Sequence, residues 1–183
     1  MASGTIPTTL EIMDQMTISA VESHLKIGLP VEADALLLIE VDGAPSAVTQ
    51  HAEHVIKVCQ ACGAAKVVEA KTLKEAEDLW KARRSISPAC GKIALTKISE
   101  DATVPRSKIP EMIRGVREIA KKYNLKMVIF GHAGDGNLHP NILSNKRDKE
   151  EMKKVELAVA DLFRLALSLG GTLSGEHGIG YMK

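Results

Sequence analysis

The chain has 183 residues, a length at which one domain buries about two-thirds of the surface of its unfolded chain. Its 24 basic and 23 acidic side chains nearly cancel, and aromatic residues make up only 3% of it. Without a basic excess or rings for base stacking, the composition argues against nucleic acid as a partner. No apolar run reaches the roughly 20 residues that span a membrane, and the first ten residues lack the features of a signal peptide, so we expect a cytoplasmic protein.

The cysteines also suit a reducing compartment. Cys59 and Cys62 form a C-x-x-C pair, but they lie at the end of a helical pattern that Gly63 closes, where the helix dipole does not favour a thiolate. We therefore interpret them as small core residues on one helix face, not as a redox pair.

Hydrophobic periodicity and capping residues predict an alternation of helices and strands in the first half of the chain. The expected elements are, in order, a weak amphipathic helix over 10–26, a strand over 35–41, a helix over 46–62 with Ser46 as N-cap and an inward apolar face, a strand over 66–70, and a helix over 72–87 that opens on a Thr72–Glu75 capping box and ends at Pro88.

The second half continues the same rhythm. The expected elements are a strand over 98–104, an amphipathic helix over 109–123, strands over 126–130 and 138–143, and a long helix that Asp148 caps and that Gly170-Gly171 ends. These units favour an α+β fold, a ferredoxin-like sandwich in which helices pack on one face of a mostly antiparallel sheet. A doubly wound α/β fold is the competitor, but the first strand is not followed by a G-x-G-x-x-G turn.

The segment 131–141 carries the clearest chemical signal. Asp135-Gly136 between two strand-like runs predicts a tight hairpin, and if these two residues form the turn, His132 lies opposite His139 on one face of the sheet. Two imidazoles placed in this way can chelate one divalent metal, although a third ligand is then needed. Asn141 shares the face of His139. The alternative is a pair of ordinary strand histidines, and the spacing alone leaves both interpretations open.

A second segment, 170–180, has five glycines and the pair Glu176-His177 at its centre. Its glycines predict a loop that packs closely against another part of the molecule. The loop follows a helix instead of preceding one, which argues against a phosphate-binding loop. An ordinary glycine-rich connection is the alternative.

Arg83 falls on the inward face of its predicted helix, where an arginine usually has an anionic partner. That partner could be a structural carboxylate or the carboxylate of a ligand, and the pattern does not decide between them. Lys97 has the position of an ordinary strand-edge lysine.

Four segments, taken together and in this order, resemble one known family: 79–83, 96–101, 131–141 and 174–180. The chain is similar, from about Ile12 to its end, to the C-terminal domain of FAD-linked 2-hydroxyacid oxidases and dehydrogenases. The nearest resemblance is to the flavin-bearing large subunit of glycolate oxidase, and D-lactate dehydrogenases are related.

The resemblance implies a role for each residue of the two motifs. His132, His139 and Glu176 match the ligands of a divalent metal, zinc or manganese. His177 matches the base that takes the proton of the substrate hydroxyl, and Asn141 matches a residue that helps to bind substrate near the metal.

The resemblance also assigns residues to the substrate carboxylate. Arg83 matches the arginine that holds it, and Lys97 matches a second residue on the carboxylate side. Ser87 stands where some relatives have threonine, so it is a further candidate for substrate contact.

The implied activity is that of an FAD-dependent enzyme that oxidises a small 2-hydroxyacid, glycolate or D-lactate, while hydride passes to flavin. Residues 1–183 would then be the substrate-side domain of a longer protein, without the N-terminal FAD-binding domain and a final C-terminal helix. We expect this fragment alone to be inactive, free of bound flavin and prone to self-association. We also expect its two histidines to be in place, its Glu176 to be displaced or disordered, and a metal to be absent or weakly held. The expected partners are the 2-hydroxyacid, the missing flavin domain and electron-accepting subunits of a glycolate oxidase complex, which could bring the protein to the inner face of the membrane.

Two alternatives of another class stay open. A non-catalytic ferredoxin-like module could bind a small ligand or mediate assembly, but it leaves the histidine hairpin without a purpose. A metal-dependent hydrolase could use the same ligands with a metal-bound water.

Overall fold

The structure of the chain is a computed structural model that describes residues 4–180. Its elements, in chain order, are β1 (Thr9–Asp14), α1 (Gln15–Leu25), β2 (Ala35–Glu40), α2 (Pro45–Ala61), α3 (Leu73–Arg84), α4 (Ile86–Ile93), β3 (Thr96–Ser99), β4 (Ala102–Thr103), the 3-10 helix η1 (Arg106–Lys108), α5 (Ile109–Tyr123), β5 (Lys126–His132), β6 (Asn137–Ser144) and α6 (Lys149–Ser168). None of these helices is both long and apolar enough to cross a membrane.

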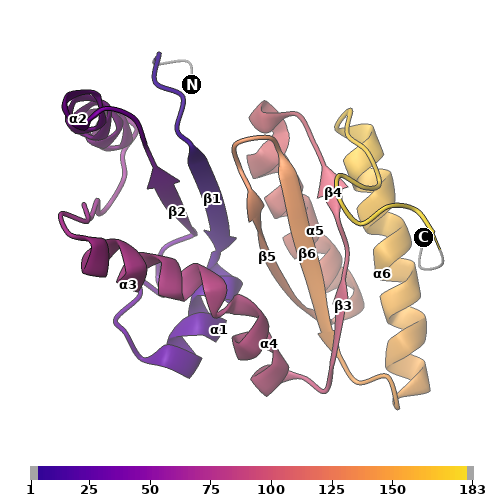
Figure 1. Ribbon diagram of the computed structural model, residues 1–183. Coiled ribbons are helices and arrows are strands. Elements are labelled where there is room, and N and C mark those ends of the chain that lie inside the picture. The colour runs from indigo at the N-terminus through magenta and orange to yellow at the C-terminus, as the bar shows by residue number, and fades with distance from the viewer. Residues whose placement is uncertain (1–3, 181–183) are drawn as a thin grey trace.

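The strands of the described chain form one sheet in which every neighbouring pair is antiparallel. Its order is β2-β1-β5-β6-β3, and the short β4 also pairs with β6 (Figure 1). Helices pack on this sheet, so the predicted α+β class is confirmed. The sheet places the β5–β6 hairpin near its centre, with β1 on one side and β3 and β4 on the other.

Helices cover both faces of the sheet, and the prediction that they pack on one face is wrong. On one face, α5 and α6 enclose a core with Ile12, Ile129 and Ile142 of the strands. On the other, α1, α3 and α4 pack on a smaller cluster with Met13, Val128 and Leu143. The physical reason is that β1, β5 and β6 carry apolar side chains at successive positions, which point to opposite faces of the sheet.

The segment 10–26 is not a single helix as the weak periodicity predicts. It begins as β1, an inner strand between β2 and β5, and turns into α1 at Asp14. The Asp14 carboxylate accepts hydrogen bonds from the backbone N–H of Thr17 at 2.9 Å and of Ile129 at 3.1 Å. This buried N-cap ties the start of α1 to β5, and sheet pairing therefore overrides the helical pattern.

The segment between β2 and α3 departs furthest from expectation. The helix α2 forms, but it begins at Pro45 without a side-chain cap from Ser46, and none of its residues is fully buried. Residues 66–70 have no regular structure. Cys59 is only partly buried and Cys62 is exposed, so they are not core residues.

The capping box at Thr72 and Glu75 is confirmed, with the reciprocal bonds to the backbone that define it. Pro88 does not end this helix. Helix α3 ends at Arg84, and Ser85 separates it from the next helix, α4. Pro88 lies in the first turn of α4, where its missing N–H costs no intrahelical hydrogen bond. A proline one turn after a helix break is therefore compatible with two short helices.

The strand predicted over 98–104 is interrupted. It forms β3 and β4, and between them Glu100 and Asp101 are buried. The backbone N–H of Glu100 donates to the carbonyl of Pro140 at 2.9 Å, so the chain stays attached to β6 through the break. This break directs Asp101 toward the C-terminal loop.

Candidate functional site

The β5–β6 hairpin holds both predicted histidines, in a register that differs from the prediction. His132 pairs with Asn137 and His139 pairs with Phe130, so the loop is 133–136 and the two histidines are not directly opposed. Within the loop only Gly136 has a positive φ, of 91°, whereas a two-residue turn of the predicted type needs two such residues. The carboxylate of Asp135 instead accepts from the N–H of Asn137 at 2.9 Å.

The two histidines nevertheless lie together on one face of the sheet. The register differs from the predicted one by an even number of residues, which leaves each side chain on its face. The rings of His132 and His139 are diagonal neighbours, with centroids 5.3 Å apart and planes at 90°. The prediction that the two histidines lie side by side on one face is therefore confirmed, although they are diagonal neighbours and not directly opposed.

The C-terminal loop docks against β4 and the end of the hairpin. The N–H of Thr172 donates to the carbonyl of Thr103 at 2.8 Å. Gly175 lies so close to this surface that a Cβ would stand 2.3 Å from Oγ1 of Thr103 and 2.8 Å from Cγ of Asn137. The expectation that the glycines allow close packing is confirmed, and in Figure 1 the yellow C-terminal segment passes beside β4.

Asp101 organises this loop and was not singled out by the sequence patterns. One of its carboxylate oxygens accepts from the Ser174 hydroxyl at 2.7 Å and from the N–H groups of Gly175, Glu176 and His177 at 2.9, 2.9 and 2.8 Å. Burial by itself would raise the pKa of Asp101, but the bonds from His177, Glu176, Ser174 and Gly175 outweigh it and hold this pKa far below its usual range. Asp101 thus stays ionised and fixes the backbone from which Glu176 and His177 project.

Glu176 projects toward the two histidines. Its carboxylate oxygens lie 3.3 Å from Nε2 of His132 and 3.9 Å from Nε2 of His139, so the expectation that Glu176 is displaced is wrong. One potential ligand atom from each of the three residues can be chosen so that all lie within 4.8 Å of one another. A tetrahedral ion held at about 2.1 Å by such ligands separates them by about 3.4 Å, and the imidazole and carboxylate types suit zinc or manganese. The residues therefore fit a divalent metal.

The surroundings of His139 favour a neutral imidazole. Burial lowers the pKa of His139, the nearby carboxylate of Glu176 raises it in part, and His132 lowers it further. The ring of His177 stacks on that of His139, with centroids 5.4 Å apart and planes at 11°. Phe130 lies on another side of His139, with centroids 5.6 Å apart. His177 is exposed, so it lies beside the cluster and remains open to a ligand.

Arg83 reaches the same cluster through Glu11, a residue that the sequence patterns missed. Nε of Arg83 donates to Glu11 at 2.6 Å, and the guanidinium lies 5.0 Å from the centre of the Phe130 ring. The other carboxylate oxygen of Glu11 contacts Nδ1 of His132. The anionic partner of Arg83 is therefore a carboxylate of this chain, and within residues 4–180 its terminal amino groups have no hydrogen-bond partner. Glu11 was missed because its segment was assigned to a helix. Glu11, Ile12 and Met13 are all buried and point to alternate faces of the sheet, which is typical of a strand between two layers.

Of the remaining predicted residues, Asn141 contacts the cluster through the backbone of His139, whereas Lys97 and Ser87 contact each other. Asn141 is fully buried, its amide donates to the carbonyl of His139 at 2.8 Å, and its Oδ1 has no hydrogen-bond partner in the described part of the chain. Lys97 donates to the hydroxyl of Ser87 at 2.9 Å, and both are exposed. A role of these three residues in substrate binding stays a prediction.

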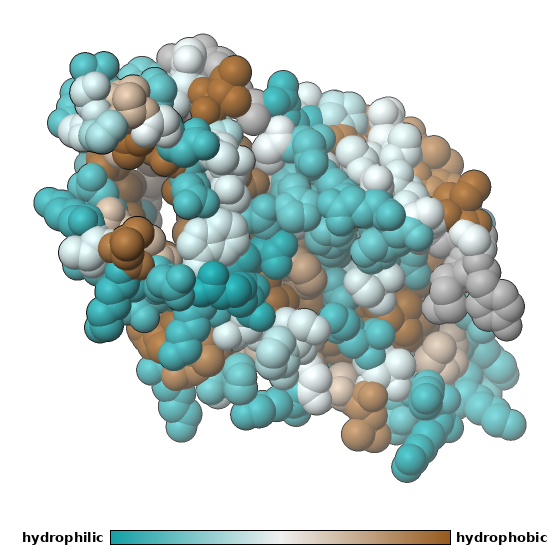
Figure 2. All heavy atoms as spheres, viewed as in Figure 1, coloured by the Kyte–Doolittle hydropathy of each residue, from teal (hydrophilic) through white to brown (hydrophobic). Residues whose placement is uncertain are grey.

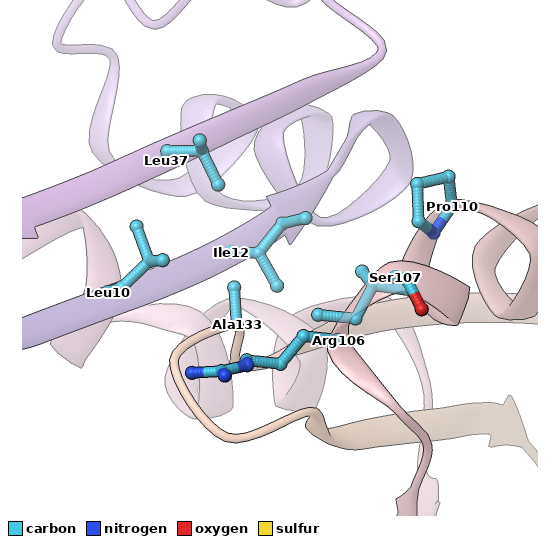
Figure 3. A pocket seen from close by; sticks show the side chains of 8 residues that line it. Leu10, Ile12, Leu37, Arg106, Ser107, Pro110 and Ala133 are labelled. Carbon is cyan, nitrogen blue, oxygen red and sulfur yellow. The ribbon is translucent and has the colours of Figure 1, made fainter. Parts of the chain in front are cut away.

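A cavity of about 440 Å³ lies on the other face of β1 (Figure 3). Leu10, Ile12 and Leu37 line it from the β1–β2 pair, and Arg106 and Pro110 line it from the other side. Because Glu11 and Ile12 point to opposite faces, the sheet separates this apolar cavity from the histidine cluster. By contrast, hydrophilic side chains gather in the middle of the face seen in Figure 2, beside the end of α3 and in front of β5 and β6.

Comparison with known proteins identifies the family of this chain and supports its fold. The family described as FAD linked oxidases, C-terminal domain, matches residues 1–183. The chain belongs to this family. Glycolate oxidase subunit GlcD of Bacillus subtilis is 47% identical over the whole chain, and GlcD of Escherichia coli strain K12 is 37% identical over the whole chain. D-lactate dehydrogenase of Archaeoglobus fulgidus is 33% identical over 97% of the chain.

The chain spans 39%, 36% and 38% of the length of these three relatives. A solved structure of alkyldihydroxyacetonephosphate synthase superposes on 94% of this chain and 36% of its own, with a TM-score of 0.60 at 15% identity, which supports the fold. The family thus supplies the class of protein, an FAD-linked oxidase, and the site geometry must support the details.

Proposed function

We propose that this chain is the substrate-side domain of an FAD-dependent enzyme that oxidises a small 2-hydroxyacid, glycolate or D-lactate, to the 2-oxoacid. The observation that carries the proposal is the convergence of His132, His139 and Glu176, with His177 stacked beside them. The names of the relatives, glycolate oxidase subunit and D-lactate dehydrogenase, supply the substrate class.

In the proposed site, His132, His139 and Glu176 hold a zinc or manganese ion. When bound, such an ion would act as a Lewis acid toward the hydroxyl and carboxylate of the substrate. Neutral His139 is suited to this role because an imidazole ligand must offer a lone pair. The carboxylate of Glu176 offsets part of the positive charge.

Arg83 and His177 have separate roles, in substrate binding and in proton transfer. The terminal amino groups of Arg83 face no other partner among the described residues and can bind the substrate carboxylate, while Glu11 and Phe130 fix the guanidinium. His177 accepts the hydroxyl proton as the hydride leaves the α-carbon. Its backbone N–H is held by Asp101, which positions the ring without using the ring nitrogens. Flavin, bound mainly by another part of the whole enzyme, would supply the hydride acceptor.

Asn141, Lys97 and Ser87 keep proposed roles in substrate binding near the ion and the carboxylate. We extend the proposal to the whole protein in the same way: it would work with electron-accepting subunits of a glycolate oxidase complex, in the cytoplasm or at the inner face of the membrane through those subunits. The word subunit in the names of the GlcD relatives supports a complex.

The hydrolase alternative is weaker because it gives no purpose to the cluster's arginine. A hydrolase needs an open position for a metal-bound water, which the three ligands also provide. However, a half-buried guanidinium with its terminal amino groups toward no described partner suits a substrate with a carboxylate, and the family is one of FAD-linked oxidases.

The proposal is tested by His177→Ala in a full-length flavin-loaded protein that carries this domain. We expect kcat for the 2-hydroxyacid to fall by about 10² or more, because a general base contributes roughly that factor. Stopped-flow measurement of flavin reduction isolates the chemical step. His51→Ala, on the exposed face of α2, is the matched control and should retain the rate of flavin reduction.

Arg83→Lys in the same protein should mainly raise KM for the 2-hydroxyacid.

Near-normal flavin reduction in the His177 variant would contradict the assigned base. Hydrolysis of an ester or amide by the metal-loaded protein, without flavin reduction by any 2-hydroxyacid, would favour the hydrolase.

A further inference from the structure

Glu11 is a buried carboxylate with two partners on opposite sides. It lies on β1 directly opposite His132 in the sheet register, and only 6% of its surface is exposed. One oxygen contacts Nδ1 of His132, and the other accepts from Nε of Arg83 at 2.6 Å. A carboxylate buried to this degree is tolerated only when such partners satisfy it.

The contact with Glu11 determines which nitrogen of His132 is available. A carboxylate accepts hydrogen bonds and does not donate them, so the neutral ring carries its proton on Nδ1. The lone pair of Nε2 then points to the other side of the ring, where the carboxylate of Glu176 lies at 3.3 Å. A ligand histidine that donates its second nitrogen to a carboxylate is fixed in both tautomer and orientation.

We propose that Glu11 is a positioning residue that fixes the tautomer and orientation of His132 and links this metal ligand to the substrate arginine, Arg83. The inference rests on the proposed function for the roles of His132 and Arg83. Glu11 lies on β1, outside the two segments, 131–141 and 174–180, that carry the histidines and Glu176.

The packing around Glu11 makes this link rigid. Arg83 lies over the ring of Phe130, and Phe130 contacts the ring of His139. His139 in turn lies against His132. The five side chains therefore close a ring of contacts, so that Arg83 and the two histidines keep one relative geometry. A substrate that binds through both its carboxylate and its hydroxyl needs such a fixed distance.

Substitution by glutamine separates positioning from general stability. In Glu11→Gln, one amide oxygen must serve two donors, His132 and Arg83, and the amide N–H₂ opposes the guanidinium. We expect the Nδ1–H tautomer of His132 to lose population to the Nε2–H tautomer. In Glu11→Gln/Arg83→Met, the oxygen has His132 as its only donor, and the Nδ1–H tautomer should return.

The tautomer is measured by long-range ¹H–¹⁵N correlation spectra of the ¹⁵N-histidine-labelled chain without metal, at a pH high enough that the His132 nitrogen shifts are those of a neutral ring, with the His132 signals assigned from their loss in His132→Gln. The expected order is Nδ1–H in the wild type, a shift in Glu11→Gln, and recovery in the double variant. Glu40→Gln, an exposed glutamate on the neighbouring strand β2, is the matched control and should match the wild type. A wild-type His132 protonated on Nε2, or a tautomer unchanged in Glu11→Gln, would overturn the inference.

A second arm titrates zinc into the same variants by calorimetry. We expect Glu11→Gln to weaken binding by about 10- to 100-fold, the usual effect of losing an outer carboxylate, with partial recovery in the double variant. If zinc binds none of the proteins but the tautomer follows Glu11, the metal proposal fails and the positioning role stands. If zinc binds the wild type and Glu11→Gln equally and the tautomer does not change, the metal site stands and the role of Glu11 fails. Circular dichroism of each variant verifies that it is folded.

Discussion

The two faces of the sheet differ in what their side chains do. On the face covered by α5 and α6, Ile129, Leu138 and Ile142 belong to a continuous apolar core. On the opposite face, apolar residues form a smaller cluster beneath α1, α3 and α4, and Glu11, His132 and His139 lie beside it. The same strands therefore build both a core and a polar site.

This difference shows how closely stability and chemistry are interleaved along the chain. Leu138 and His139 are adjacent, yet they point to opposite faces and into environments of opposite polarity. Because the first face supplies most of the buried apolar surface, it can tolerate a polar second face at the centre of the sheet. Substitutions of adjacent residues should then have separable effects.

The largest expected effect on stability is that of Leu138→Ala. Leu138 is fully buried, so we expect the free energy of unfolding to fall by about 2–5 kcal/mol through lost burial and a cavity. His139→Gln should cost about 1 kcal/mol, the average for a point substitution, and instead abolish zinc binding. Urea unfolding followed by circular dichroism compares the two. Equal losses of stability in the two variants would contradict the view that the Leu138 face supplies the stability and the His139 face the metal site.

A smaller and local effect is expected from Asp101→Asn. The amide keeps one acceptor oxygen but loses the charge that four donors share, and each bond to a charged acceptor is worth about 1.5–3 kcal/mol. Hydrogen exchange of the Glu176 and His177 amides should accelerate by about tenfold or more. Exchange of amides in β6 serves as the internal control, and acceleration there as well would indicate global instability in place of release of the loop.

The smallest effect concerns Asp161 of α6, whose carboxylate accepts hydrogen bonds from Lys122 and Tyr123 of α5. These two helices cover the apolar face of the sheet. Hydrogen bonds from Lys122 and Tyr123 lower the pKa of Asp161 to about 2, below the ordinary value of 3.8. The stability that they contribute is present above pH 3.8 and is lost as the pH falls toward 2. We expect Asp161→Asn to lower Tm slightly at pH 7, by an amount that shrinks between pH 4 and about 2. A pH-independent difference in Tm, or a change in zinc binding, would contradict this assignment to the core face.

Local sequence predicted the parts of the fold that local interactions determine. The capping box at Thr72, the helix over 109–123 and the cap at Asp148 all form because their signals lie within one or two turns. The register of the β5–β6 hairpin was wrong by two residues, because Asp135 caps the loop with its side chain instead of adopting a positive φ. The even shift preserved the faces, so the histidines were still predicted on one side.

The missed parts of the site depend on contacts that are distant in sequence. Glu11 meets its partner His132 across 121 positions, and Asp101 meets the loop across 73 to 76 positions. Neither residue lies in a local pattern that reveals its role. Hydrophobic periodicity indicated a helix over 10–26 and an unbroken strand over 98–104, and neither of these elements suggests a contact with a distant loop or histidine. The family resemblance supplied the motif residues, while the carboxylates that position them became visible only in the tertiary structure.

The most direct test of the site is calorimetric titration of the wild-type chain and Glu176→Gln with zinc and with manganese. The geometry predicts one metal per chain for at least one of the two ions, and an affinity about tenfold or more lower in Glu176→Gln, because a carboxylate ligand then becomes a neutral amide. Glu156→Gln, on the exposed side of α6, should bind as the wild type does. If neither ion binds the wild-type chain, or if the affinity is the same in Glu176→Gln, then His132, His139 and Glu176 do not form a metal site in this chain.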